Sequence, residues 1–87
     1  MQSPTALVVD DERDIRDLLG MALSRMGLQV VSAESVQQAK LFLDQSRYDL
    51  CLTDMRLGDG SGIDLIRYVN EHFPSMPIAM LTAFGDV

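Results

Sequence analysis

The sequence has few cysteines, lysines and prolines and no long apolar run. Its single cysteine, Cys51, cannot form a disulfide within the chain, which fits a reducing compartment and predicts a cytoplasmic protein. Its single lysine, Lys40, and a formal net charge of -6 argue against direct binding to the phosphate backbone of DNA or RNA. The longest uncharged stretch, from His72 to Gly85, is too short to cross a bilayer. Because the first residues have neither a basic start nor an apolar run, we expect no signal peptide.

The residues that are present fit one small α/β domain. With 87 residues, of which 47% are apolar, the chain is long enough for a single domain, residues 1–87, and not for two. Four short apolar runs recur at nearly even spacing: Ala6–Val9, Leu28–Val31, Leu50–Thr53 and Ile78–Leu81. Short apolar runs bounded by turn residues are typical of strands covered on both faces, and such strands are usually parallel.

Amphipathic helices are predicted between these strands. The first helix has apolar residues at helical spacing, namely Ile15, Leu18, Leu19, Ala22, Leu23 and Met26, and Gly27 follows as a helix stop. The second helix opens with a capping-box pattern at Ser35, and the third opens with a looser version at Ser61 and ends before Pro74. The third is expected to bury Ile63, Ile66, Tyr68, Val69 and Phe73. This alternation predicts an open, doubly wound parallel sheet with helices on both faces.

Acidic residues follow two of the predicted strands. Asp10 and Asp11 come after the first strand and Asp54 after the third, while Thr82 follows the fourth. Ligands of doubly wound sheets bind at the carboxyl ends of the strands, so the three aspartates would meet if the first and third strands are neighbours. Such like-charged groups repel one another, and their oxygen atoms suit Mg²⁺. A carboxylate beside that ion can accept a phosphoryl group, with the Thr82 hydroxyl nearby.

Each of these signals also has an ordinary structural interpretation. The acids that follow the first strand, together with Glu12, could cap the first helix, and Thr82 could simply end a strand. Other polar residues of the following loop, Asp59, Ser61 and Asp64, are interpreted as loop and helix-capping residues. Cys51 is expected to be a buried apolar filler.

These residues resemble the receiver domain of two-component response regulators. The resemblance rests on the segments Leu7–Glu12, Leu52–Leu57, Asp59–Gly62 and Met80–Ala83, which occur in the order and at the spacing of that family. The segments from Asp54 to Gly62 further resemble the receivers of nitrogen-regulator-type transcription activators. The resemblance implies a flavodoxin-like (CheY-like) fold with the strand order 2-1-3-4.

The resemblance also implies roles for individual residues. Asp54 would be the phosphoacceptor, which takes a phosphoryl group from a sensor histidine kinase, and Thr82 would be the switch hydroxyl. Asp10 and Asp11 would hold Mg²⁺ together with Asp54 and the backbone carbonyl of Arg56. The protein would then be a phosphoacceptor that controls a transcriptional output domain, and not an enzyme.

Two features depart from the family pattern. Gly58 stands where the family commonly has proline, which predicts a looser loop. After Thr82 the family continues with a helix, a strand that carries an essential lysine, and another helix, so we expect the chain to lack this last unit. Lys40 lies in the second predicted helix and cannot replace that lysine. We therefore expect weak self-catalysed phosphotransfer, and self-association through the uncovered edge of the strand Ile78–Leu81.

Two other functions remain open. A receiver-like interaction module would keep the fold without phosphotransfer. An aspartyl-phosphate hydrolase of the haloacid-dehalogenase kind would need its nucleophile after the first strand and a second aspartate two residues later, where this chain has Glu12.

Overall fold

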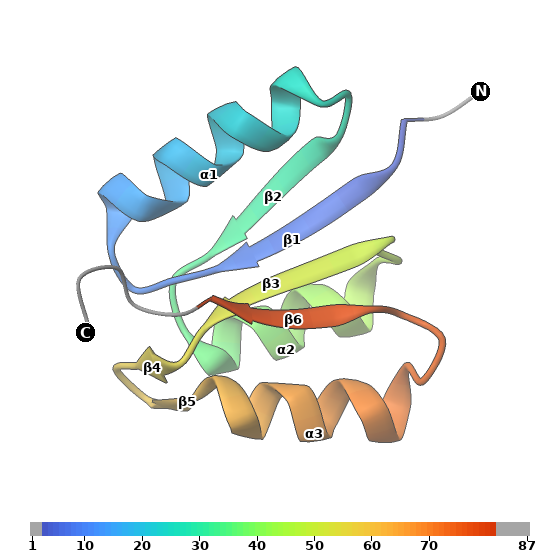
Figure 1. Cartoon of the computed structure of the whole chain (residues 1–87). Coiled ribbons are helices and arrows are strands. Elements are labelled where there is room, and N and C mark those ends of the chain that lie inside the picture. Colours follow the sequence, from blue (N-terminus) through green and yellow to red (C-terminus); the bar gives the residue numbers. More distant parts are fainter. Residues whose placement is uncertain (1–2, 82–87) are drawn as a thin grey trace.

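The computed structural model describes residues 3–81. The elements are, in chain order, β1 (Thr5–Val9), α1 (Arg13–Arg25), β2 (Gln29–Ala33), α2 (Val36–Gln45), β3 (Leu50–Asp54), β4 (Arg56–Leu57), β5 (Gly60–Ser61), α3 (Gly62–His72) and β6 (Ile78–Leu81) (Figure 1). No helix in this range is long and apolar enough to span a membrane.

The four longer strands form one parallel sheet in the order β2-β1-β3-β6. This order confirms the predicted 2-1-3-4 arrangement, because β6 is the fourth predicted strand. Within residues 3–81, β2 and β6 form the two edges of the sheet. In the centre, Val9 of β1 lies opposite Thr53 of β3, so the carboxyl ends of these two strands lie side by side.

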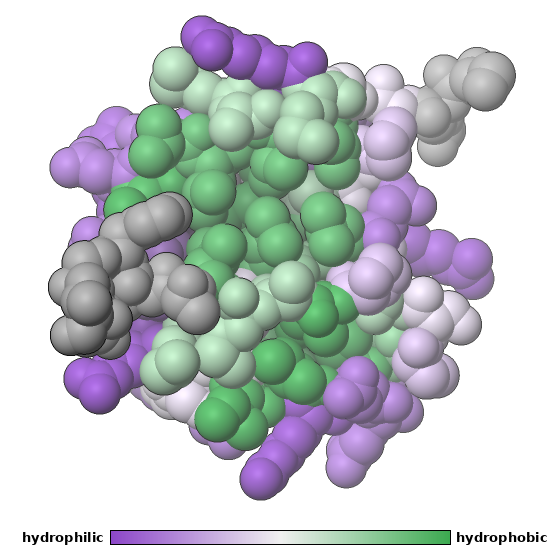
Figure 2. All heavy atoms as spheres, in the orientation of Figure 1, coloured by the Kyte–Doolittle hydropathy of each residue, from purple (hydrophilic) through white to green (hydrophobic). Residues whose placement is uncertain are grey.

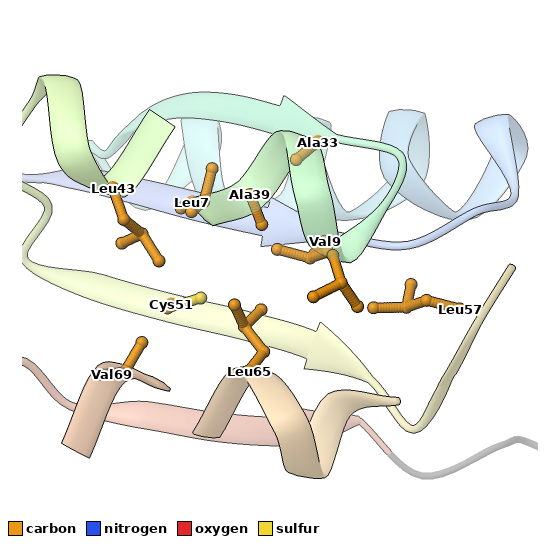
Figure 3. Packing of buried hydrophobic residues seen from close by; sticks show 10 residues of the cluster. Leu7, Val9, Ala33, Ala39, Leu43, Cys51, Leu57, Leu65 and Val69 are labelled. Atoms are coloured by element: carbon orange, nitrogen blue, oxygen red, sulfur yellow. The ribbon is translucent and has the colours of Figure 1, made fainter. Parts of the chain in front are cut away.

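One face of the sheet is covered by α2 and α3. Between these helices and the sheet lies a cluster of fully or nearly fully buried side chains: Leu7, Val9, Ala33, Val36, Ala39, Leu43, Cys51, Leu57, Leu65 and Val69 (Figure 3). Full burial of one Leu or Val side chain is worth roughly 1.5–3 kcal/mol, so this cluster dominates the stability of the domain. Cys51 is the buried filler that was expected, and burial raises the pKa of its thiol to about 12.

The other face of the sheet is covered by α1 alone within the described residues. Its buried cluster is small and consists of Ala6, Val8 and Leu23. Leu50 and Leu52 of β3 are half-buried there, and apolar side chains are visible over the middle of the sheet in Figure 2. The prediction of helices on both faces is therefore confirmed, but the two faces differ in how completely they are covered.

The structure corrects the predicted inward faces of two helices. On α1, Leu18 is 62% exposed and Met26 is 73% exposed, because only the side of the apolar stripe that carries Leu23 packs on the sheet. On α3, Ile63 is 49% exposed, whereas Leu65, which was not predicted to be buried, lies fully in the core. Helical spacing identifies an apolar stripe but does not fix which part of it meets the sheet.

The bounds of three strands also differ from the prediction. The first strand begins one residue earlier, at Thr5, and the third ends one residue later, at Asp54. The second strand runs from Gln29 to Ala33 rather than from Leu28, because the turn after α1 takes up Leu28. In that turn Gly27 has a φ of 93°, and the N–H of Leu28 donates to the carbonyl of Leu23. This is a Schellman-type helix end, which favours glycine. The short antiparallel hairpin β4–β5 was not predicted.

Candidate functional site

Three aspartates meet at the carboxyl end of the sheet. Asp10 follows the last residue of β1, Asp11 comes next, and Asp54 is the last residue of β3. One carboxylate oxygen from each lies within 4.8 Å of the others, and we call these three residues the acid cluster. The structure thus brings together the three acids that the sequence predicts to converge.

Asp10 is the buried member of the acid cluster. It is 4% exposed, and burial is the main cause that raises the pKa of its carboxyl group. The backbone N–H of Glu12 donates to its Oδ1 over 2.9 Å, which lowers the pKa, while the charges of Asp54 and Asp11 raise it. A buried carboxylate beside two like charges is stabilised by a bound cation.

The backbone of Asp10 is held from two directions. Its N–H donates to the carbonyl of Ala33 over 3.1 Å, which extends the pairing of β1 with β2 beyond the strand. Its carbonyl accepts a hydrogen bond from Arg16 Nη1 of α1 over 2.7 Å. This contact of Arg16 was not predicted; the available signal was a basic residue in the first helix, shortly after an acidic run.

Asp54 is half-buried and is oriented by its own loop. The N–H of Met55 donates to Asp54 Oδ1 over 2.9 Å. Because side chains alternate along a strand, Asp54 follows Leu50 and Leu52 on the side of the sheet covered by α1. Cys51 belongs to the cluster on the opposite side.

Gly62, the first residue of α3, lies against the backbone of Asp54. A Cβ atom placed on Gly62 would come within 2.3 Å of the Asp54 carbonyl oxygen, so α3 can start this close to the acid cluster only with glycine. The N–H of Gly62 also donates to the carbonyl of Met55 over 2.8 Å. This role was not predicted, since a loop glycine has no distinguishing signal in one sequence.

Three residues that were interpreted as loop or helix-capping residues accept backbone N–H groups at the start of a helix: Asp59, Ser61 and Asp64. Ser61 and Asp64 form the capping box of α3, as predicted. Asp59, interpreted as a loop or cap residue near this helix, instead binds the start of α2: its carboxylate accepts hydrogen bonds from the N–H groups of Val36 and Gln37. Glu12 is the N-cap of α1, but its side chain makes no capping hydrogen bond. Asp10 accepts the N–H of Glu12 at the start of α1, so a role at this helix end accounts for Asp10, but it does not account for Asp54, which lies in β3.

The chemistry of the acid cluster suits a magnesium ion. It offers three carboxylate oxygens at close range, and no histidine or cysteine of the described part of the chain belongs to it. Hard oxygen ligands that leave room for water and phosphate are what Mg²⁺ prefers. Arg56, whose carbonyl is the further ligand implied by the resemblance, is the first residue of β4. Thr82 lies outside the described residues.

A hollow elsewhere in the molecule does not contain this chemistry. It has a volume of about 540 Å³ and lies at the opposite end of the sheet, before β3 and β6 begin. Tyr48, Phe73, Met76 and Pro77 contribute to its lining, with Arg47 and Asp49 as its charged groups. The acid cluster thus lies at the carboxyl end of the sheet and not in this hollow.

Comparisons with known proteins bear on the family and the fold of this chain. A family model described as the response regulator receiver domain matches residues 6–87. The chain is 51% identical over 87 residues to the response regulator protein PilR of Pseudomonas aeruginosa, with 100% of this chain and 20% of that protein covered. It is 31% identical over 87 residues to the DNA-binding transcriptional regulator NtrC of Proteus hauseri, with 100% of this chain and 18% of that protein covered. The chain therefore spans about a fifth of the length of these two curated relatives.

Solved structures give the same result for the fold. The response regulator protein TrrA of Thermotoga maritima, solved in complex with Mg²⁺ and BeF, superposes with a TM-score of 0.89 at 30% identity and covers 94% of this chain and 71% of that chain. The chemotaxis response regulator CheY4 of Vibrio cholerae superposes with a TM-score of 0.90 at 24% identity, covering 98% and 72%. With this fold and the family match over residues 6–87, the chain belongs to the receiver-domain family of response regulators.

Proposed function

We propose that this chain is a phosphoacceptor domain in which Asp54 receives a phosphoryl group from the phosphohistidine of a sensor histidine kinase. Phosphoryl acceptance and Mg²⁺ binding are general properties of the receiver family. The observation that carries the proposal for this chain is the acid cluster, in which Asp54 lies within 4.8 Å of two further carboxylates. The family match over residues 6–87 supports the interpretation of the chain as part of one receiver domain.

In the proposed reaction, an Asp54 carboxylate oxygen attacks the phosphorus atom. A new O–P bond forms, the N–P bond of the phosphohistidine breaks, and its electron pair stays on the imidazole nitrogen. The Met55 N–H holds Asp54 Oδ1, which leaves the second carboxylate oxygen to attack. Asp10 and Asp11 would hold Mg²⁺ with Asp54 and the Arg56 carbonyl, and the bound ion supplies positive charge for the phosphoryl oxygens. In this proposal the Thr82 hydroxyl binds the transferred group.

The partners follow from the relatives. The relatives are response regulators and transcriptional regulatory proteins, and several resemble NtrC-type activators. We infer that this chain acts in the cytoplasm, between a sensor kinase and a transcriptional output domain, and does not itself bind nucleic acid. Its net charge of -6 supports the last point.

A second, independent contact is proposed at the edge strand β6. Within the described residues β6 pairs only with β3, and Ile78 and Leu81 are half-buried. An unpaired edge beside an incompletely covered apolar face favours pairing with a second copy of the chain. Sedimentation should show a concentration-dependent dimer, and a monomer at every concentration would contradict this contact.

The phosphoacceptor is tested by the mass of the intact protein after treatment with acetyl phosphate and Mg²⁺. We expect a labile phosphoryl adduct in the wild type and in Asp64→Asn, a matched change to an aspartate that only caps α3. We expect no adduct in Asp54→Asn. An adduct that persists in Asp54→Asn would assign the phosphoryl group to another residue. A wild type that forms none would favour the interaction module without phosphotransfer.

A further inference from the structure

Asp59 joins the loop after Asp54 to a helix that is distant in the sequence. It lies in the turn of the β4–β5 hairpin. Its Oδ1 accepts a hydrogen bond from the N–H of Val36 over 2.8 Å, and its Oδ2 accepts one from the N–H of Gln37 over 3.0 Å. These bonds with Gln37 and Val36 hold the pKa of Asp59 below its ordinary value.

The start of α2 depends on this carboxylate. The first N–H groups of a helix have no partner within the helix and need an acceptor from outside. Ser35, the N-cap of α2, satisfies only the N–H of Gln38. The first two, Val36 and Gln37, bind Asp59, so the hairpin completes the cap of α2. If the hairpin moves, these two N–H groups lose their acceptor.

The hairpin is also fixed to the acid cluster. Arg56 of β4 is paired with Ser61 of β5, and Gly62 donates to the carbonyl of Met55 directly after Asp54. On the other side, the hairpin packs on α2, since a Cβ on Gly60 would lie 3.2 Å from a methyl group of Val36. The hairpin that bears the Arg56 carbonyl is thus held at one end by Asp54 and at the other by α2.

We infer that Asp59 is a positioning residue, which sets the Mg²⁺ affinity of the acid cluster by holding the Arg56 carbonyl in place. Through the same contacts, Asp59 links the binding of Mg²⁺ at the acid cluster to the stability of the first turn of α2. The inference rests on the proposed function, because it assumes that the acid cluster and the Arg56 carbonyl hold Mg²⁺. Coupling between two sites is reciprocal in binding free energy. A bound ion that orders the hairpin therefore also strengthens the two hydrogen bonds at the start of α2.

The test measures the Mg²⁺ dissociation constant of the intact protein by NMR titration. Asp59→Ala removes both acceptors, and we expect it to weaken Mg²⁺ binding by about 3- to 10-fold, at or below the usual effect of removing a partner that orients a metal ligand. Asp59→Asn removes the same charge but keeps one acceptor oxygen, so its loss should be smaller. Ser35→Ala removes a cap of the same helix without touching the hairpin, and Asp64→Asn removes a charge on the other side of the hairpin. Both controls should stay within about twofold of the wild type.

Amide hydrogen exchange provides a second measurement. In the wild type, saturating Mg²⁺ should slow exchange at Val36 and Gln37, and in Asp59→Ala it should not. Equal Mg²⁺ affinity in the wild type and Asp59→Ala, or an equal loss in Asp64→Asn, would overturn the inference and leave the proposed function standing. Unchanged exchange at these two amides in the wild type would also overturn it. A wild type that binds no Mg²⁺ would instead refute the metal site of the proposed function.

Discussion

Two sets of aspartates, one at the carboxyl end of β1 and β3 and one in or just after the β4–β5 hairpin, differ in what surrounds their carboxylates. The acid cluster places three carboxylates within 4.8 Å of one another, and its buried member, Asp10, has a raised pKa. The capping aspartates, Asp59 and Asp64, each accept backbone N–H groups at the start of a helix. The first set destabilises the fold without a cation, and the second stabilises it. The proposed function therefore depends on charges that the described part of the fold leaves close together without a cation.

The largest expected effect is the stabilisation of the protein by Mg²⁺, which should depend on the acid cluster and not on the capping aspartates. At a free Mg²⁺ concentration 100 times its dissociation constant, the free energy of unfolding should rise by about 2.7 kcal/mol. Asp11→Asn should lose most of this gain, because it removes one ligand, whereas Asp64→Asn should keep it. Urea unfolding of the intact protein with Mg²⁺ and with EDTA measures both. A full gain in Asp11→Asn would remove that residue from the metal site.

The second prediction concerns the contact between Gly62, the first residue of α3, and the backbone of Asp54 in the acid cluster. Gly62→Ala should destabilise the protein by about 2 kcal/mol, because the new methyl group meets the Asp54 carbonyl and must push α3 away from the acid cluster. Gly58→Ala is the control, since its Cβ would meet nothing within 4 Å. Thermal unfolding compares the two variants. If both alanines have the same effect, the close approach of α3 to Asp54 is not a structural requirement.

The third prediction is a smaller change in the free energy of unfolding, which should have opposite signs for a substitution in the acid cluster and for one in the capping box of α3. Without divalent cations, Asp54→Asn should stabilise the protein by about 1 kcal/mol, because it relieves repulsion at ~5 Å in a site open to water. Ser61→Ala, which removes one half of the capping box that Asp64 completes, should destabilise it by about 1 kcal/mol. Urea unfolding in EDTA measures both free energies. Destabilisation by Asp54→Asn under these conditions would show that the acid cluster is not under electrostatic strain.

The smallest predicted effect is the pH dependence of the Asp59 contribution. Its pKa in the folded protein lies below 3.8, because the N–H groups of Gln37 and Val36 bind the charged form, and Lys40 is a further favourable charge. Its stabilisation is therefore complete above the unfolded pKa and is lost as the pH falls through the folded pKa. The stability difference between wild type and Asp59→Ala should shrink as the pH is lowered below about 4. A difference that stays constant down to about pH 3 would argue against a charged acceptor.

The acid cluster could be predicted from the sequence because Asp10 and Asp54 each directly follow an apolar run and Asp11 is the next residue after Asp10. Apolar runs locate buried strands well, and parallel strands bring their carboxyl ends to one edge. The strand order followed from the resemblance of the motifs around Asp54 and Thr82, and β2-β1-β3-β6 confirmed it. The roles of Asp10, Asp11, Asp54, Arg56 and Thr82 remain predictions.

Contacts between distant segments could not be predicted. Asp59 and Val36 are 23 positions apart, and neither helical nor strand periodicity reports which helix a loop carboxylate will cap. The exposure of Leu18 and Met26 has a related cause. Their spacing fits an apolar helical stripe, but the described sheet face offers α1 only enough surface to bury Leu23 and to half-bury its neighbours.

The alternation of side chains along β3 has a consequence for how this domain can change in length. Cys51 points into the α2–α3 core, and Asp54 continues the opposite face. One residue inserted between them would put both side chains on the same face of the sheet. Either the aspartate would then turn toward the core and leave the acid cluster, or the thiol would leave the core, so β3 tolerates no change of length at this point.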